Sequence, residues 1–322
     1  MKTSVAMCTY NGENYLLKQL QSILYQTKSI NEIVICDDCS TDKTIDVIQD
    51  FAKKSPISVI VKENAKNIGY TKNFEQAICL CSGDIIFLSD QDDIWMPEKV
   101  AVICDFFDSH PDISFVFTNA VLVNLKGVNS YDKTLFDAVG WNKHTKKIFQ
   151  DGYGYEVLST MGRITGATTA LRASFIPHCI PFPKTSIPIV HDERIAISAI
   201  VNDKIACIDK CLIKYRLHYK QSIGLGSLLK YPPPPWELSN NIYIHHQELI
   251  EPHEHYKKDK LVFAYKRFFA IRDRYSLIRL FCFLLKGDYK KYYPDSVIHV
   301  FKRDIISVFK RLLYATAMKV KQ

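Results

Sequence analysis

The amino-acid sequence predicts an α/β protein with a mainly parallel central sheet, flanked by helices on both faces. The chain has 322 residues, 47% of them hydrophobic, which is enough to bury a full core. Short β-branched runs alternate with amphipathic helical patterns over residues 1–123. Such alternation is typical of consecutive βαβ units, whose strands pair in parallel.

Each element of this pattern can be assigned from its apolar spacing. The expected strands are Ser4–Cys8, Ile33–Cys36, Ile57–Val61, Ile85–Leu88 and Ser114–Val123. The expected helices between them are Tyr15–Tyr25, Thr44–Lys53, Tyr70–Leu80 and Pro97–Phe107. Beyond Asn124 the pattern weakens to a helix at Asp192–Ile200 and strands near Ile205–Ile208 and Leu212–Leu217.

The domain boundary is expected near residue 230, because the prolines Pro232–Pro235 follow directly. Proline can continue neither a helix nor a central strand. Residues 1–230 should form one domain with halves at 1–123 and 124–230. Residues 231–322 should form a C-terminal helical extension, with amphipathic helices near Lys257–Lys286 and Tyr289–Lys319.

The net charge of +8 is distributed unevenly along the chain. Residues 256–322 contain 17 Lys and Arg against 5 Asp and Glu, whereas residues 1–255 contain 25 against 29. A basic tail of this kind is typical of proteins that meet nucleic acid or an anionic membrane. The sequence shows neither a Gly-rich RNA motif nor an aromatic sheet platform, so we expect no nucleic-acid partner.

The apolar stretch Tyr275–Leu285 is too short to span a bilayer and is interrupted by Arg279. Its mixed apolar and basic residues suit an interfacial helix on anionic lipid; the alternative is a helical cap packed on the domain of residues 1–230. The N-terminus lacks the pattern of a secretory signal. We therefore expect a cytoplasmic protein, peripheral on the inner face of the cell membrane. The ten cysteines are expected to be reduced. Zinc ligation by Cys36 and Cys39 together with Cys207 and Cys211 is the weaker alternative.

Polar residues follow three of the expected strands, at the end where parallel α/β sheets bind ligands. They occupy Thr9–Gly12, Asp37–Asp42 and Ser89–Asp93. The last segment contains Asp90, Asp92 and Asp93, whose negative charges repel one another unless a cation neutralises them. Oxygen ligands favour Mg²⁺ or Mn²⁺ as that cation. The alternative is a solvated turn or a cap for the next helix.

The segment after the second strand carries more polar groups than a helix cap needs. Ser40, Thr41 and Asp42 are ordinary capping residues for the helix that follows. Because one residue is enough to cap the helix, Asp37 and Asp38 are not needed as caps. A carboxylate at this position could accept the imide N–H of a uracil or thymine ring.

Taken in order, these motifs resemble the family-2 glycosyltransferases. The matching segments are Thr9–Gly12, Asp37–Thr44, Asn67–Gly69 and Asp90–Trp95, the last as the metal-binding DxD motif. Leu88–Trp95, His191–Glu193 and Tyr215–His218 are similar to the rhamnosyltransferase-like branch, and the resemblance covers roughly residues 3–224. It implies the GT-A nucleotide-diphospho-sugar transferase fold, which joins a nucleotide-binding half to an acceptor half.

The resemblance also implies an activity. It is that of an inverting, metal-dependent glycosyltransferase, which moves a sugar, with rhamnose favoured, from a dTDP- or UDP-sugar. The acceptor would be a saccharide or a lipid-linked molecule in the synthesis of cell-surface polysaccharide, such as O-antigen or capsule. Mg²⁺ or Mn²⁺ would be the cofactor.

By position, the resemblance further implies roles for single residues. The nucleotide would contact Thr9, Tyr10, Asp38, Asn67, Lys72 and Asp90. Gly166 and Asp90 would lie at the donor sugar, and Asp92, Asp90 and His218 at the metal, with Asp92 as the first choice. Asp192 would be the general base. Each role has an alternative: a solvated lysine for Lys72, a plain turn for Gly166, a surface residue for His218 and a helix N-cap for Asp192.

Two other functions fit the same fold. A sugar nucleotidyltransferase would need a basic, Gly-rich loop after the first strand to hold a triphosphate. Thr9–Glu13 contains neither lysine nor arginine and has one glycine, which disfavours that class. A non-catalytic nucleotide-sugar-binding protein would need no base on the acceptor side, so Asp192 disfavours it.

Overall fold

The computed structural model describes residues 1–152, 154–158, 163–182, 190–202, 204–218 and 221, and in the C-terminal part residues 276–288, 290, 298, 301–302 and 305. The chain divides into two compact units, Met1–Pro252 and His253–Gln322. The boundary expected near residue 230 lies outside the described residues and stays a prediction.

The first unit is built on a nine-stranded sheet in the order β3-β2-β1-β4-β8-β6-β9-β5, with β7 paired to β6. The strands are β1 (Thr3–Thr9), β2 (Glu32–Asp37), β3 (Ser58–Glu63), β4 (Ile85–Ser89), β5 (Ile94–Trp95), β6 (Phe115–Val123), β7 (Asn129–Thr134), β8 (Thr169–Arg172) and β9 (Ile205–Arg216). The five strands that the sequence pattern predicted in residues 1–123 are all present, and the short strand β5 was not predicted.

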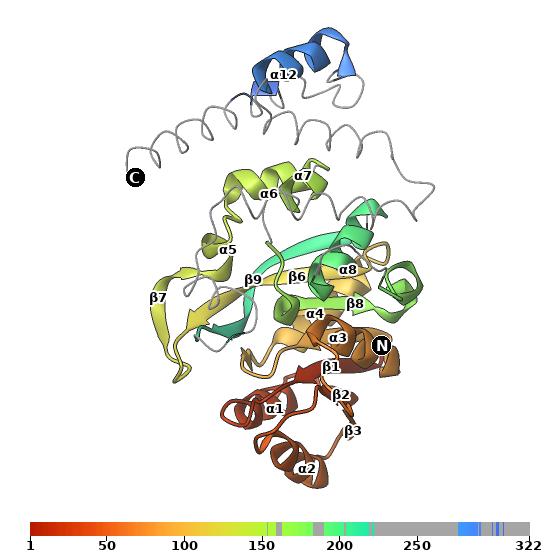
Figure 1. Ribbon diagram of the computed structural model, residues 1–322, viewed down its shortest axis with the longest axis vertical. Helices are drawn as coiled ribbons and strands as arrows, with labels where there is room; N and C mark the ends of the chain where they lie inside the picture. The colour runs from red at the N-terminus through yellow and green to blue at the C-terminus, as the bar shows by residue number, and fades with distance from the viewer. Residues whose placement is uncertain are drawn as a thin grey trace. The chain divides into compact units, whose positions relative to one another are not determined.

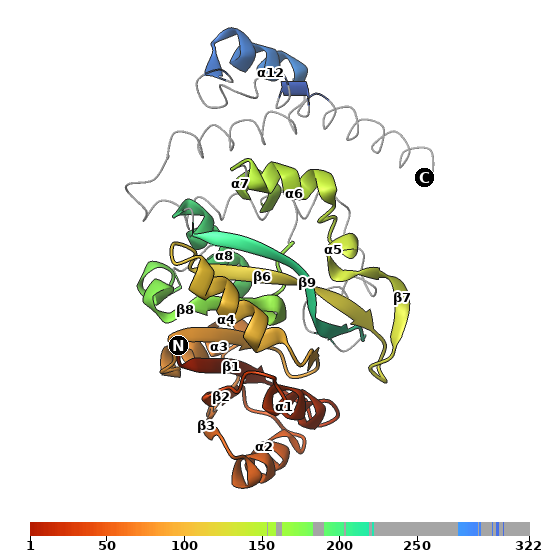
Figure 2. The same ribbon diagram turned by 180° about the vertical axis from the view of Figure 1, so that it is seen from behind.

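The helices of this unit cover both faces of the sheet. They are α1 (Leu16–Leu24), α2 (Thr44–Lys54), α3 (Tyr70–Leu80), α4 (Lys99–Ser109), α5 (Leu135–Ala138), α6 (Lys143–Gln150), α7 (Gly154–Leu158) and α8 (His191–Val201), with the 3-10 turns η1 (Gly166–Thr168) and η2 (Ala173–His178). Helices α3 and α8 lie in front of the sheet in Figure 1, and α4 lies in front when the molecule is turned around in Figure 2. The three-layer arrangement confirms the expected fold class.

The sheet is more mixed than the sequence pattern predicted. Strands β1 to β4 pair in parallel, as expected. Strand β8 then inserts between β4 and β6 and is antiparallel to both. Strand β9 runs parallel to β6, whereas β5 and β7 are antiparallel to their neighbours. The expectation of a mainly parallel sheet thus holds for β1 to β4, whereas the rest of the sheet mixes parallel and antiparallel pairs.

One expected pair of strands is a single strand in the structure. Ile205–Ile208 and Leu212–Leu217 were expected to be separate, but β9 runs continuously through both. The register of β9 against β6 shifts on either side of Asn119, which marks a bulge. A bulge accommodates extra residues without ending the strand, so the polar residues Asp209 and Lys210 do not break it.

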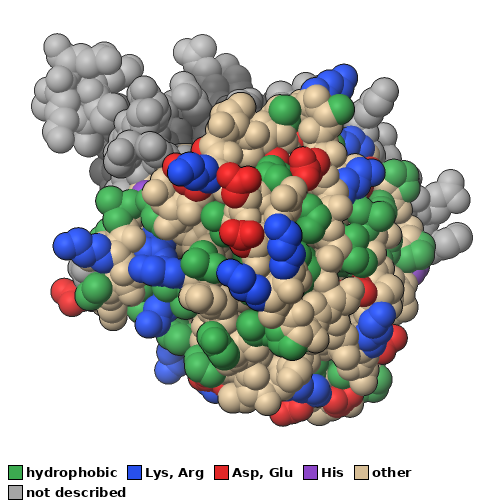
Figure 3. Space-filling view, turned by 90° about the horizontal axis from the view of Figure 1, so that it is seen from below, with side chains coloured by type: hydrophobic (Ala, Val, Ile, Leu, Met, Phe, Trp, Pro, Cys, Tyr) green, Lys and Arg blue, Asp and Glu red, His purple; other side chains and the backbone are tan. Residues whose placement is uncertain are grey.

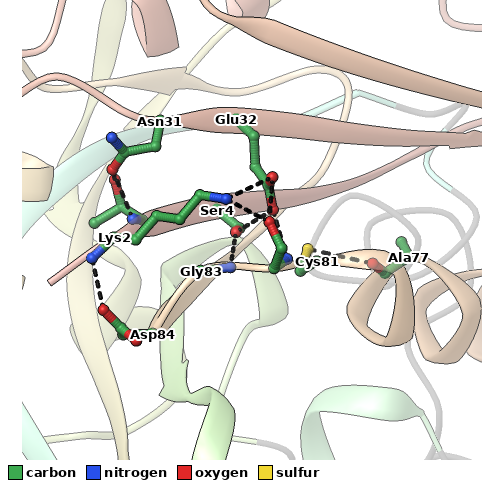
Figure 4. Close-up of polar contacts among 10 residues, drawn as sticks. Lys2, Ser4, Asn31, Glu32, Ala77, Cys81, Gly83 and Asp84 are labelled. Carbon is green, nitrogen blue, oxygen red and sulfur yellow. Dashed lines mark hydrogen bonds and ion pairs between the residues drawn. The ribbon is translucent and has the colours of Figure 1, made fainter.

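The strand ends away from the candidate site are fixed by a buried carboxylate. Most charged side chains lie on the surface, and Figure 3 shows them interspersed with apolar ones on one face of the protein. Glu32 is an exception, because it is almost fully buried. It accepts hydrogen bonds from Ser4 Oγ and from Ser82 N and Oγ, each at 2.6 Å, beside Lys2 (Figure 4). Burial alone would raise the pKa of Glu32, but these donors outweigh it and lower the pKa to about 2. Glu32 therefore stays ionised and ties β2 to β1 and the start of β4.

The second unit contains helix α12 (Ser276–Leu285). Leu280 is its buried centre, packed by Leu277, Phe283, Phe301 and Ile305. The helix falls within the first of the two helices expected for the extension; most of both lies outside the described residues. Among the described residues, no helix is long and apolar enough to cross a membrane.

Candidate active site

The carboxyl ends of β1, β2 and β4 lie at one edge of the sheet. Thr9 is paired in register with Asp37, and Met7 with Ser89. The loops that follow these strands are joined by hydrogen bonds. Asn11 N donates to Ser40 Oγ at 2.9 Å, and Asn11 Oδ1 accepts from Thr41 N at 2.8 Å. The three polar segments of the sequence therefore meet, as the βαβ pattern predicted.

Thr9 and Asp37 belong to the internal framework of these loops. The Thr9 hydroxyl donates to Asp37 Oδ2 at 2.6 Å, and both side chains are buried. Asp37 also accepts from Ser40 N and Ser40 Oγ. Tyr10, in contrast, is 45% exposed, so its ring is available to a ligand at this edge.

Asp38 supports the loop that enters α3. Its Oδ1 accepts from Asn64 Nδ2 at 3.0 Å and from Ile68 N at 2.8 Å, and its Oδ2 accepts from Gly69 N at 2.9 Å. Asn67 Nδ2 donates to the Asp38 carbonyl at 3.3 Å. Gly69 has φ +84°, a conformation that glycine adopts without strain. The sequence did not predict these contacts, which link the second and third nucleotide-binding motifs.

Lys72 lies on the first turn of α3 and forms an ion pair with Glu75, with N–O distances of 3.0 and 2.9 Å. Its side chain is 54% exposed. Glu75 in turn accepts from Phe182 N at 3.1 Å. A contact of Lys72 with a diphosphate stays a prediction, and it would require Lys72 to exchange this surface partner.

The DxD loop is held by the end of β9. Arg216 is almost fully buried; its backbone N donates to Asp93 Oδ1 at 2.9 Å and its Nε to the Asp92 carbonyl at 2.6 Å. His218 Nε2 lies 2.7 Å from Asp92 Oδ2. The Tyr15 ring stacks on His218 with centroids 5.1 Å apart, and the Arg216 guanidinium lies 5.0 Å from the same ring. The late segment Tyr215–His218 is thus brought to the DxD motif across more than a hundred residues of sequence.

Asp92 and His218 are paired in space, while Asp93 points into the protein. Asp93 is fully buried, and its Oδ2 and the Nδ1 of His218 have no hydrogen-bond partner among the described residues. Within that part of the chain, no group of three or more His, Cys, Asp and Glu side chains is placed to hold a metal ion. Beside the DxD loop, the described residues therefore offer a metal ion the Asp92 carboxylate and the His218 imidazole.

Negative charge is concentrated around Asp90. Burial first, and then the charges of Asp92 and Asp192, raise the pKa of Asp90 to about 7, against an opposing effect of Lys99. Lys99 is fully buried; its Nζ donates to the Ala167 carbonyl at 2.7 Å and lies 3.9 Å from the Trp95 ring centroid. Lys99 shares the apolar face of α4 with Val100 and Ile103, a position that could have singled it out in the sequence.

Asp192 lies on the first turn of α8, facing η1. Its Oδ2 accepts from Gly166 N at 2.7 Å and its Oδ1 from Glu193 N at 2.8 Å. Burial, and then the neighbouring Glu193 charge, raise the pKa of Asp192 to about 7. The N-cap residue of α8 is Val190, so the alternative role of Asp192 as the N-cap is excluded.

Gly166 is required by packing against α8. A Cβ at this position would lie 2.7 Å from His191 Nε2 and 3.5 Å from Asp192 Oδ2. The His191 ring fills that space and stacks on Phe74 with centroids 3.8 Å apart. Burial lowers the pKa of His191 to about 3, so the imidazole is neutral. The sequence interpretation linked the absence of a side chain at Gly166 to a donor sugar, and the structure supplies this second reason.

Comparison with known proteins identifies the family. The sequence model described as glycosyl transferase family 2 matches residues 4–172, slightly more than half of the chain. An uncharacterized glycosyltransferase of Nostoc sp. is 28% identical over 223 residues, which span 68% of this chain and 65% of the relative. The dTDP-rhamnosyl transferase RfbG of Shigella flexneri is 37% identical over 109 residues, or 32% of this chain and 38% of the relative. The matched segments thus span less than two thirds of either relative.

Among solved structures, residues 1–349 of TarS from S. aureus, in complex with UDP-GlcNAc, share the fold of this chain. The TM-score is 0.56 at 21% sequence identity, covering 90% of this chain and 76% of that one. The sequence match and the shared fold confirm the family resemblance and the GT-A fold. The chain therefore belongs to glycosyltransferase family 2.

Proposed function

We propose that this glycosyltransferase moves a sugar from a dTDP- or UDP-sugar to a hydroxyl of a saccharide or lipid-linked acceptor, with inversion at the anomeric carbon. The product would be part of a cell-surface polysaccharide. The observation that carries this proposal is geometric: His218 from the end of β9 lies 2.7 Å from Asp92 in the DxD loop, Asp192 is held by the Gly166 N–H at 2.7 Å, and the charges of Asp92 and Asp192 both act on Asp90. The DxD loop and the proposed base therefore lie within electrostatic reach of one another.

Asp192 has the properties of a general base. Its carboxyl is buried, is held by the Gly166 N–H and has a pKa near 7. Ionised Asp192 would remove the proton from the acceptor hydroxyl while that oxygen bonds to the anomeric carbon. The bond from this carbon to the diphosphate oxygen breaks in the same step. Because attack and departure take place on opposite sides of the carbon, the configuration is inverted.

The residues of the DxD loop fit a divalent ion bound together with a diphosphate. Mg²⁺ and Mn²⁺ sites of this kind use one or two carboxylates and take the remaining ligands from phosphate and water. Asp92 and His218 would hold the ion, with Asp90 beside them. When bound, the ion would offset the negative charge that builds up on the departing nucleoside diphosphate.

The nucleotide would lie over the first three strand ends. Exposed Tyr10 offers a ring for the base. Asp38 is buried and already accepts three hydrogen bonds, which leaves about one of its four acceptor sites for an imide N–H. Thr9 and Asn67 shape this loop edge, Lys72 would reach the diphosphate, and Gly166 and Asp90 would border the sugar. Rhamnose is the favoured sugar, supported by the DxD-region motif and by the Shigella relative.

The experiment that tests the proposed donor class is a panel of nucleotide sugars offered to the purified protein with Mg²⁺ or Mn²⁺. We expect one dTDP- or UDP-sugar to raise the melting temperature and to be hydrolysed slowly without acceptor. If only GDP- or CMP-sugars do so, the donor assignment is wrong.

We further propose that the C-terminal unit binds an anionic membrane surface. Ile278, Phe281 and Leu285 are exposed at helical spacing on one side of α12. Lys286 and Lys290 are exposed nearby, in a segment that carries 17 basic and 5 acidic residues over positions 256–322. Exposed apolar side chains beside lysines are typical of helices that lie in the headgroup region of anionic bilayers.

Replacing Phe281 and Leu285 together with serine should reduce sedimentation of the protein with phosphatidylserine-containing vesicles. The expected cause is the loss of apolar area that inserts between the lipids. Leu80→Ser is the matched control, since Leu80 is an exposed leucine on α3 of the other unit. Equal sedimentation of all three proteins, or none by the wild type, would show that α12 does not bind lipid.

A further inference from the structure

The middle residue of the DxD motif contacts the nucleotide loop rather than the metal side. Gln91 Oε1 accepts from Tyr10 N at 2.9 Å, and Gln91 Nε2 donates to the Tyr10 carbonyl at 3.0 Å. The side-chain amide thus pairs with both polar groups of one residue's backbone, in the way that neighbouring strands pair. Asp90 and Asp92 flank this amide on the same loop, so the contact joins the β4–β5 loop directly to the β1–α1 loop.

A glycine makes room for this contact. A Cβ on Gly12 would lie 2.2 Å from Gln91 Oε1 and 2.5 Å from its Cδ, closer than non-bonded atoms approach. No positive φ is recorded for Gly12, so alanine could take its backbone conformation. The glycine is therefore required by the Gln91 amide, and any side chain at position 12 would displace that amide from Tyr10.

We propose that Gln91 is a positioning residue, which together with Gly12 locks the nucleotide loop to the loop that carries Asp90 and Asp92. The inference rests on the proposed function, because it assigns the two loops to the two ends of one nucleoside diphosphate. A ligand that bridges two loops binds more tightly when the spacing of the loops is already fixed, because less conformational entropy is lost on binding.

The contact between Gln91 and Tyr10 predicts how two substitutions change nucleotide affinity. Gln91→Ala removes both hydrogen bonds, and Gly12→Ala pushes the amide away, so the two changes break the same contact. Each should weaken binding of UDP or dTDP in the presence of Mn²⁺ by about tenfold, because the ligand must then order the two loops as it binds. The double variant should bind no more weakly than Gln91→Ala, because neighbouring changes that break one contact are not additive.

The test measures two quantities on the full chain and its variants. Calorimetry gives the Kd for UDP and for dTDP with Mn²⁺. Hydrogen exchange gives the protection of the Tyr10 amide, which donates its hydrogen bond to Gln91 Oε1 in the wild type. Gln21→Ala is the matched control, because Gln21 is an exposed glutamine on α1. We expect faster exchange at Tyr10 and weaker nucleotide binding in Gln91→Ala and in Gly12→Ala. Gln21→Ala should change neither quantity.

The outcomes separate this inference from the proposed function. If the wild type binds neither nucleotide, the proposed donor class fails, and the exchange rate at Tyr10 still decides whether Gln91 holds the loop. If the wild type binds and both variants bind equally well, Gln91 does not position the site. Additive losses in the double variant would likewise overturn it, since they would mean that Gly12 and Gln91 act separately.

Discussion

Asp192→Asn should lower kcat at least about a hundredfold, because asparagine cannot accept the proton of the acceptor hydroxyl. The amide has nearly the same shape and keeps an oxygen for the Gly166 N–H but cannot also accept from Glu193 N, so nucleotide affinity should stay near that of the wild type while the melting temperature falls slightly. Steady-state rates with the identified donor, together with calorimetry of the bound nucleotide, measure both effects. A rate near that of the wild type would remove Asp192 from the chemistry.

The pH dependence gives a second measurement of the same group. The pKa of Asp192 is raised to about 7 by burial and by the Glu193 charge, so the carboxyl is protonated below pH 7 and cannot act as a base. We expect kcat/KM to rise with pH through about 7 and then to level off. Glu193→Gln is the matched control: it should keep the plateau rate and move the midpoint to lower pH. An unchanged midpoint would show that another group controls the profile.

Asp92→Asn should reduce kcat/KM by about 10²- to 10³-fold, the loss that follows removal of one stabilising group at a departing charge. Asparagine keeps the size of the side chain but loses the negative charge that attracts a divalent ion. Titration with Mn²⁺ in the presence of the nucleoside diphosphate should therefore show weaker ion binding. Asp46→Asn, at an exposed aspartate on α2, should change neither quantity. Full activity of Asp92→Asn, or of the wild type in excess chelator, would contradict the role of the ion.

Local patterns predicted the first half of the fold well. The helix expected at Tyr70–Leu80 has those bounds in the structure, and the expected strands of the first half agree to within two residues. These elements have clear apolar spacing and follow one another in space. Strand β8 was missed because Thr169–Arg172 is short, and its place between β4 and β6 depends on pairing with strands far away in sequence.

The sequence identified the motifs that form the site, but not the hydrogen bonds and packing contacts that hold them. The motifs singled out Asp90, Asp92 and Asp192, and in the structure the charges of Asp92 and Asp192 both act on Asp90; the roles assigned to the three residues stay predictions. The sequence could not show that Asp38 braces the loop before α3, because its three donors come from residues 26 to 31 positions away. Nor could it show that His191 occupies the space beside Gly166, because that contact joins two separate segments of the second half.

The anomeric configuration of the product tests the central claim most directly. With the donor found in the nucleotide-sugar panel and a hydroxyl acceptor, proton NMR of the new glycosidic linkage reports the configuration at the transferred carbon. The single displacement assigned to Asp192 predicts inversion relative to the donor. A product with retained configuration would contradict it, because two successive displacements would need a nucleophile that this account does not contain.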